Sequence, residues 1–165
     1  MSHVLSPFGW SDRWAALAAT AVDDLGRTDA TPGRVVRHDG VAVIVASADG
    51  EQRSLPWLGT VDPAPVVGDW VLATSQIVVA VLPRSSLLRR RDPHRDVEQA
   101  LVANVEVVFV VCGLDRQVKP GRIQRVTTLA WDAGAVPVVV LTKADVVDEP
   151  VAIATEVAAA NPGVD

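Results

Sequence analysis

Four consecutive residues, Thr142, Lys143, Ala144 and Asp145, end the apolar run 136–141. A carboxylate at a strand end can accept two hydrogen bonds from a planar donor pair, such as the ring N–H and exocyclic amine of guanine. Adenine lacks this pair, so an unpartnered carboxylate would disfavour it by roughly 10⁴-fold or more. The stem of Lys143 can lie flat on the base and shield it from water. The tetrad fits a guanine site, and it equally fits polar residues that only close a strand; the four residues alone do not decide between the two.

The elements that must position this tetrad follow a strand–helix–strand pattern. The run "VEVVFVVCG" (105–113) is continuously apolar, as expected of a strand buried on both faces. A helix should begin at Pro120 and end at Gly134, with "VPVVVLT" as the second strand. Its inward stripe is Ile123, Val126, Leu129, Ala130 and Ala133. A right-handed βαβ unit places the tetrad at the carboxyl ends of parallel strands, where ligands bind in open α/β sheets.

A further helix is expected over residues 151–160, followed by Asn161-Pro162-Gly163. Two parallel strands cannot cover both faces of their sheet and would be marginally stable alone. We therefore expect the chain to be truncated within a larger α/β domain.

The chain before residue 84 predicts a helix and a small barrel. Ser11 can cap a helix that Gly26 ends, and the turn-rich segment 27–33 resembles a linker. The apolar face of this helix comprises Trp14, Leu17, Ala18, Ala21 and Leu25. Five strand-like runs follow, over 34–38, 41–47, 51–55, 68–74 and 77–83, with Asp-Gly turns at 39–40 and 49–50. Five short antiparallel strands favour a closed barrel, either an OB-fold, which we prefer, or an SH3-like barrel.

A basic segment joins the two halves. Between residues 84 and 95 the only acid is Asp92, so five arginines minus one aspartate leave a charge of +4. The arginines are Arg84, Arg89, Arg90, Arg91 and Arg95. They could contact RNA phosphates, or form a solvated linker. We divide the chain into an N-terminal helix and linker (1–33), an OB-fold-like barrel (34–83), a basic linker (84–100) and an α/β portion (101–165).

Composition excludes several classes of protein. A net charge of −5 over 165 residues gives no general attraction to nucleic acid, so such affinity must be local. One cysteine, Cys112, excludes an internal disulfide framework, and it reads as a core residue. No apolar run approaches the roughly 20 residues of a membrane helix, and no signal peptide is evident. We expect a cytoplasmic monomer with no membrane contact.

Three stretches carry a family resemblance: "LPRSSLLRRRDP", "EQALVANVEVVFVVCGLD" and "RIQRVTTLAWDAGAVPVVVLTKADV". They resemble the ribosome small subunit-dependent GTPase A family, circularly permuted GTPases of ribosome assembly, over about residues 66–147. The resemblance implies an N-terminal OB-fold before a P-loop-type GTPase domain whose base-recognition motif precedes its phosphate loop. It also implies that Thr142, Lys143, Ala144 and Asp145 form the guanine-specificity motif, usually Asn-Lys-x-Asp. The implied ligands are GTP or GDP with magnesium, and the implied partner is the small ribosomal subunit with its rRNA.

Parts of such an enzyme are missing from the sequence. No G-x-x-x-x-G-K-[ST] phosphate loop occurs, so we expect this chain not to hydrolyse GTP and to bind it weakly or not at all. The sites for magnesium and for the nucleotide phosphates would lie outside this chain. The resemblance places the family's zinc site in a C-terminal part that this sequence does not contain. "DATPG" (29–33) resembles a magnesium-side motif but precedes a strand, and we interpret it as a turn.

Two alternatives to a GTPase fragment stay open. One is an OB-type RNA-binding module with a non-catalytic α/β scaffold, and the other is a degenerate relative that acts as a protein partner. Among the aromatic residues, Trp57 is the candidate for base stacking, whereas Trp70 reads as core. Trp10, Trp14 and Trp131 are expected to pack their helices.

Overall fold

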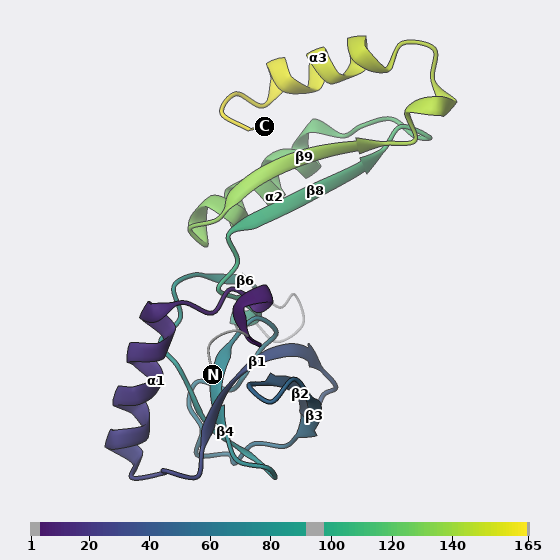
Figure 1. The fold of residues 1–165 in the computed structure, drawn as a ribbon. Coiled ribbons are helices and arrows are strands. Elements are labelled where there is room, and N and C mark those ends of the chain that lie inside the picture. Colours follow the sequence, from purple (N-terminus) through teal and green to yellow (C-terminus); the bar gives the residue numbers. More distant parts are fainter. Residues whose placement is uncertain (1–3, 92–97, 165) are drawn as a thin grey trace. The chain divides into compact units, whose positions relative to one another are not determined.

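The computed structural model describes residues 4–91 and 98–164. The chain forms two compact units (Figure 1). The first comprises Met1–Ser85 and Ala100–Asn104, and the second comprises Ser86–Gln99 and Val105–Asp165.

The first unit is built on a five-stranded antiparallel sheet that closes on itself. Its strands are β1 (Thr31–His38), β2 (Val43–Ser47), β3 (Gln52–Leu55), β4 (Trp70–Ala73) and β5 (Val78–Val81). They are hydrogen-bonded in the order β3-β2-β1-β4-β5, and a bridge between Trp57 and Val78 joins the two edges. Inward-facing residues such as Val35, Val45 and Val71 fill the barrel. The predicted OB-like barrel is therefore confirmed.

The start of β1 differs from the expected linker. Thr31, Pro32 and Gly33 already pair with β4, so only the first part of 27–33 is a turn. Gly33 is needed there because a Cβ would collide with the side chain of Val45 and lie 3.0 Å from the carbonyl oxygen of Ala46.

Helix α1 (Asp12–Leu25) packs on the outer face of the barrel. Trp14 and Ala18 are buried against Trp70, which is itself fully buried, as the sequence predicted. Gly26 ends the helix in the left-handed conformation, also as predicted, but the Ser11 side chain makes no capping hydrogen bond. The rings of Trp10 and Trp70 meet edge-on with centroids 4.8 Å apart. A short 3-10 helix, η1 (Ser6–Phe8), precedes this packing.

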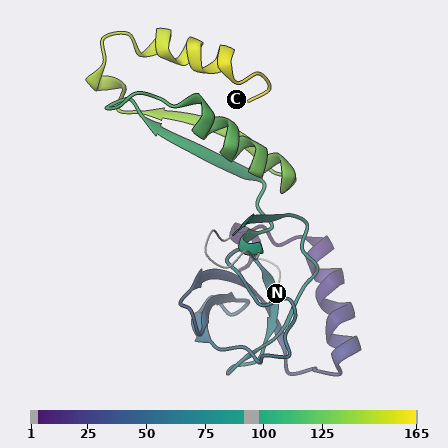
Figure 2. The same cartoon turned by 180° about the vertical axis from the view of Figure 1, so that it is seen from behind.

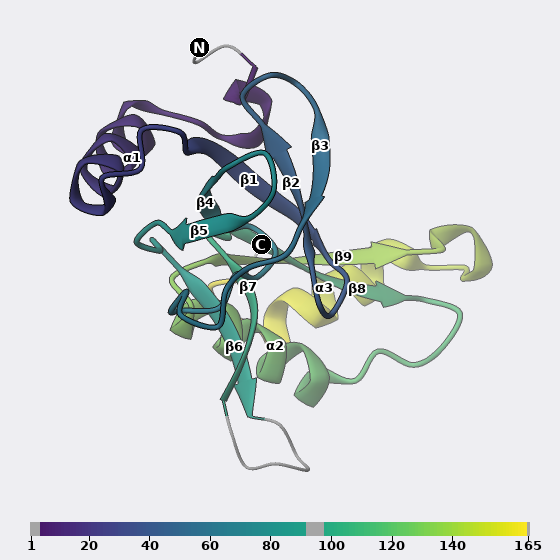
Figure 3. The same ribbon diagram turned by 90° about the horizontal axis from the view of Figure 1, so that it is seen from below.

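Residues 84–100, which the sequence suggested as a linker, contain secondary structure instead. Strand β6 (Leu87–Arg91) pairs with β7 (Glu98–Ala103) in a separate two-stranded sheet (Figure 3). The run of arginines hid this strand, because charged residues weaken the apolar alternation that marks a strand in a sequence.

The second unit contains the predicted βαβ motif. Its elements are β8 (Val107–Gly113), α2 (Pro120–Asp132), β9 (Val136–Thr142), η2 (Ala144–Val146) and α3 (Pro150–Ala160). Strands β8 and β9 are parallel, in a register that runs from Val107 opposite Val136 to Gly113 opposite Thr142. Helix α2 lies along one face of these strands (Figure 2) and buries Ile123, Thr127 and Ala130.

The expectation that β8 is buried on both faces is wrong for the described structure. Val110 is buried on the side of α2, whereas Phe109 is 65% exposed. Val107 and Val111, which share the face of Phe109, are also exposed, because no described element covers that face. Trp131, expected to pack α2, is 49% exposed as well. None of the described helices is both long and apolar enough to span a membrane.

Candidate functional site

The tetrad lies at the carboxyl ends of two parallel strands, as the sequence predicted. Thr142 is the last residue of β9, and its carbonyl oxygen accepts a 2.9 Å hydrogen bond from the backbone N–H of Leu114, just beyond β8. Lys143 follows in the left-handed conformation, with φ of +61°. This conformation is uncommon for residues other than glycine, asparagine and aspartate. It turns the chain sharply into η2, which carries Ala144 and Asp145.

The side chain of Lys143 reaches across to the end of β8. Its Nζ donates a 2.6 Å hydrogen bond to Oδ2 of Asp115. This hydrogen bond lowers the pKa of the Asp115 carboxyl below its usual value, with weaker help from the nearby charges of Lys143 and Arg116. The sequence reading missed Asp115. The available signal was an acid two residues after the first strand, at the same sheet edge as the tetrad.

Gly113 makes room for this ion pair. A Cβ at this position would lie 2.5 Å from Oδ1 of Asp115 and 3.7 Å from Cδ of Lys143. Real Cβ atoms essentially never approach another heavy atom that closely, so any larger residue would displace the carboxylate. The last residue of β8 therefore has a spatial role beside the tetrad.

Asp145 remains available for a ligand. It is exposed in η2, and its carboxylate makes no hydrogen bond or ion pair with any residue in the described ranges. In particular, no neighbouring arginine neutralises it. An exposed carboxylate without a partner can accept hydrogen bonds from a planar pair of N–H donors.

A cleft of about 470 Å³ opens beside the strand ends and is lined by Thr142 and Lys143, but not by Asp145. This volume falls in the range of about 300–1,000 Å³ that small-molecule sites occupy. Four further cations line it: Arg116, Lys119, Arg122 and Arg125. The structure thus brings part of the tetrad to a cationic cleft and places Asp145 on the adjoining turn.

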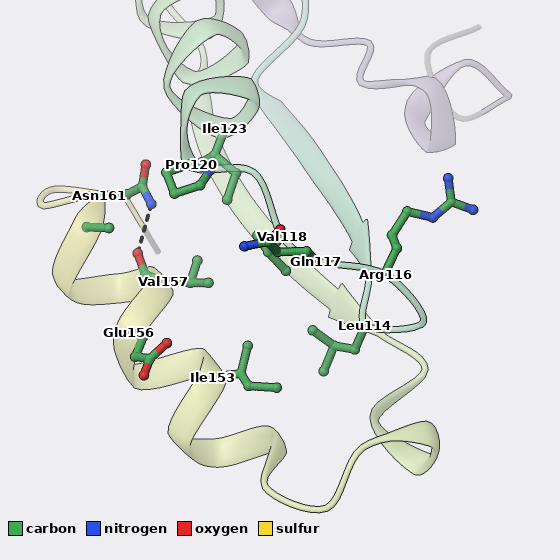
Figure 4. Close-up of a pocket in the computed structure, with 11 residues that line it drawn as sticks. Leu114, Arg116, Gln117, Val118, Pro120, Ile123, Ile153, Glu156, Val157 and Asn161 are labelled. Carbon is green, nitrogen blue, oxygen red and sulfur yellow. Dashed lines mark hydrogen bonds between the residues drawn. The ribbon is translucent and has the colours of Figure 1, made fainter.

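A second cleft, of about 500 Å³, separates α2 from α3 (Figure 4). Ile123 of α2 and the α3 residues Ile153 and Val157 give it a mainly apolar lining. Arg116 directs its guanidinium away from these side chains, and Asn161 donates a 2.8 Å hydrogen bond to the carbonyl oxygen of Val157. No residue of the tetrad lines this cleft.

Arg84, predicted as an RNA contact, has a structural role instead. Its Nε and one terminal nitrogen each lie 2.8 Å from an oxygen of Asp69, which is fully buried. The same terminal nitrogen lies 2.9 Å from the carbonyl oxygen of Ala64, and the side chain is 13% exposed. Asp69 also accepts a 2.8 Å hydrogen bond from the backbone of Val66. Arg84 is thus occupied in holding a loop of the barrel unit.

The arginines of β6 are more accessible. Arg89 forms a 2.8 Å ion pair with Glu98, and Arg90 donates to Gln99 at 3.3 Å, both across to β7. Exposed pairs of this kind are weak, so a phosphate can compete with them. Arg91 is also exposed but has an interaction within the chain. Arg95 lies outside the described residues.

Trp57, the candidate for base stacking, is half-buried and takes part in closing the barrel. Its ring lies 5.4 Å from that of His38, measured between centroids. The described residues contain no group of three His, Cys, Asp or Glu side chains that would fit a metal ion. Cys112 is a half-buried free thiol in β8.

Comparisons with known proteins agree with this arrangement. The family model described as RsgA GTPase matches residues 81–164. A protein named small ribosomal subunit biogenesis GTPase RsgA, from Streptomyces coelicolor, is 40% identical over 172 residues, covering 97% of this chain and 46% of the relative. A protein of the same name from Syntrophotalea carbinolica is 35% identical over 154 residues, covering 82% and 42%.

Two solved structures share the fold. The crystal structure of YjeQ from Thermotoga maritima superposes with a TM-score of 0.59 at 24% identity, over 79% of this chain and 48% of that one. YloQ, described as a circularly permuted GTPase, superposes with a TM-score of 0.59 at 14% identity, over 81% and 48%. The chain spans less than half the length of the curated relatives described above. Because the family model covers more than half of the sequence, this chain belongs to the RsgA GTPase family.

Proposed function

We propose that this chain supplies guanine recognition and RNA contact to a GTP-hydrolysing factor that matures the small ribosomal subunit. The observation that carries the proposal is the unpaired Asp145 carboxylate on the turn after β9, next to a lysine whose side chain is already held in place. The names of the relatives support the ribosomal role. A cytoplasmic, monomeric protein suits this role.

In the proposed complex Asp145 accepts hydrogen bonds from the ring N–H and exocyclic amine of guanine. The aliphatic stem of Lys143 covers one face of the base. Thr142 stands where the family motif usually has asparagine. A threonine hydroxyl offers a single oxygen that both donates and accepts, whereas the asparagine amide has a separate NH₂ donor and carbonyl acceptor. The ligand is GTP or GDP.

Hydrolysis needs groups that these residues do not provide. Magnesium would stabilise the phosphate charge during attack by water, and a phosphate loop would hold the phosphates. The sequence has no such loop, and the described residues hold no cluster suited to a metal. We therefore propose that the 165-residue chain binds guanine nucleotides weakly and releases no phosphate by itself.

For the RNA contact we propose Arg89, Arg90, Arg91 and Arg95, without Arg84. Arg84 is excluded because its Nε and one terminal nitrogen are bonded to Asp69 and Ala64 and its side chain is only 13% exposed. Each phosphate contact would make RNA affinity more sensitive to salt.

Amide NMR titrations of the chain with GDP and ADP test the base site. GDP should shift the amide signals of residues 142–146, and ADP should not. Asp145→Asn should abolish the GDP response and favour xanthosine diphosphate, because xanthine presents a carbonyl where guanine presents an amine. Asp148→Asn, an exposed acid three residues further on, serves as the matched control. Equal shifts with ADP and GDP, or an unaffected Asp145→Asn variant, would refute guanine recognition.

A further inference from the structure

Several arginines among the described residues pair with acids or aromatic rings of the chain itself. The ion pairs are Arg27 with Asp29, Arg37 with Asp39, Arg53 with Asp49 and Glu51, Arg84 with Asp69, and Arg89 with Glu98. Arg13 and Arg34 instead lie over the rings of Trp14 and Trp70. The chain has 20 aspartates and glutamates against 15 lysines and arginines, so acidic side chains outnumber basic ones.

The first half of α2 and the loop before it are the exception. Lys119, Arg122 and Arg125 are exposed, and within the described ranges none of them makes a hydrogen bond or ion pair. Arg116 reaches Asp115 only at 3.7 Å, and its side chain is 79% exposed. No aspartate or glutamate occurs between Asp115 and Asp132. We call Arg116, Lys119, Arg122 and Arg125 the α2 cationic face.

The geometry of the helix lines these cations up. Lys119 is the N-cap residue, and Arg122 and Arg125 follow at intervals of three, so the latter two project from neighbouring turns of one side. The first turn of α2 contains no acid, and the positive end of the helix dipole lies there. At a rise of 1.5 Å per residue, the row from Lys119 to Arg125 spans about 9 Å of the helix axis.

The same side of α2 leads to the arginines of β6. Leu129, four residues after Arg125, lines a shared hollow with Arg89 and Arg90. All of these residues belong to the second unit, so their relative placement does not depend on the barrel unit. Two acids, Glu98 and Asp132, also line the hollow, and they interrupt the cations at this end without reaching the first turns of α2.

We propose that the α2 cationic face binds the phosphate backbone of structured RNA, as a continuation of the β6 contact. A row of cations along a helix matches a chain of phosphates, whereas a single nucleotide needs cations that converge on one point. When an unpaired cation of the protein neutralises a phosphate, a counterion of the RNA is released, and this release increases the affinity of the protein for RNA. This inference extends the RNA part of the proposed function. The same four cations line the cleft beside Thr142 and Lys143, so competition with GDP is needed to separate an RNA contact from a nucleotide contact.

Fluorescence anisotropy with a labelled RNA hairpin, repeated over a series of salt concentrations, tests the proposal. Each lost phosphate contact lowers the slope of log K against log salt by about 0.7–0.9. Arg122→Gln combined with Arg125→Gln should therefore reduce the slope by about 1.5 and weaken binding by about 10-fold near 0.1 M salt. The matched control is Arg27→Gln combined with Arg37→Gln, two exposed arginines that already have partners. Circular dichroism of each variant verifies that the helices are retained.

The outcomes separate this inference from the wider proposal. If the wild-type chain binds the hairpin and the α2 variant retains the full slope, the α2 cationic face is not an RNA contact. If only Arg89→Gln combined with Arg90→Gln lowers the slope, the β6 contact stands and the α2 inference fails. Failure of the wild-type chain to bind RNA at all overturns both. Competition of excess GDP with the RNA would instead assign the α2 cations to nucleotide phosphates and overturn the inference.

Discussion

Lys143 and Asp115 join the carboxyl ends of β9 and β8 through a 2.6 Å hydrogen bond between Nζ and Oδ2. The parallel register that sets Thr142 opposite Gly113 brings the two residues within reach. Lys143 has a left-handed backbone conformation, so its side chain leaves the chain at the turn that follows β9. Gly113 has no side chain, which leaves space for the carboxylate of Asp115. The direction of the Lys143 side chain is therefore set by contacts within the protein itself.

Removing the charge of Asp115 should weaken guanine binding without unfolding the protein. In Asp115→Asn the stem of Lys143 loses its charged anchor, so binding a base must first restrict its rotamers. We expect a several-fold weaker response to GDP in the NMR titration and an unchanged melting temperature. Glu149→Gln, an exposed acid close in sequence to η2, is the control. A wild-type GDP response in Asp115→Asn would show that the pair does not position Lys143.

The Lys143–Asp115 pair should persist through the whole neutral and mildly acidic range. The pKa of Asp115 is lowered, mainly by the hydrogen bond from Lys143. An aspartate whose pKa is lower in the folded protein stabilises the fold at every pH above its pKa in the unfolded chain, which is near 3.9. This stabilisation is lost as the pH falls through the pKa of the folded protein. The carboxyl carbon of Asp115 should titrate below about pH 3.9 by NMR. A midpoint at or above that value would contradict a populated ion pair in solution.

Gly113→Ala should disturb the site more than its small size suggests. The new methyl group would lie 2.5 Å from Oδ1 of Asp115, so the carboxylate must shift from the position in which Oδ2 accepts the hydrogen bond of Lys143. We expect the Asp115 titration to shift towards that of a free aspartate and the GDP response to weaken. Gly121→Ala is a suitable control, because a Cβ there meets no atom within 4 Å. If both variants keep the wild-type titration, the close packing around Gly113 is not essential.

Arg84→Ala should destabilise the barrel unit and leave the salt dependence of RNA binding unchanged. The substitution leaves the fully buried carboxylate of Asp69 without its ion-pair partner. Breaking a buried pair in this way typically lowers the free energy of unfolding by about 3–5 kcal/mol. Urea denaturation should show this loss, whereas Arg37→Ala, at an exposed pair, should have little effect. An Arg84→Ala protein of wild-type stability with a shallower salt slope would restore Arg84 as an RNA contact.

The sequence predicted the elements that obey simple periodicities. Alternation and Asp-Gly turns identified the five barrel strands, and the apolar runs on either side of a Pro120 helix start identified the βαβ unit. The strand β6 was missed because three arginines interrupt its pattern. Phe109 was expected to be buried because apolar runs indicate two covered faces, yet coverage depends on neighbours that a local pattern does not contain.

By itself the sequence indicated the family, the two kinds of fold and the position of the Thr-Lys-Ala-Asp tetrad at a strand end. These features depend on residue type and local spacing, which are present along the chain. Only the tertiary structure decided which charges are already used. It paired Arg84 with Asp69 and Lys143 with Asp115, and it left Asp145, Lys119, Arg122 and Arg125 without partners among the described residues. Ion pairing depends on distances of a few ångströms between residues far apart in sequence, which no linear pattern records.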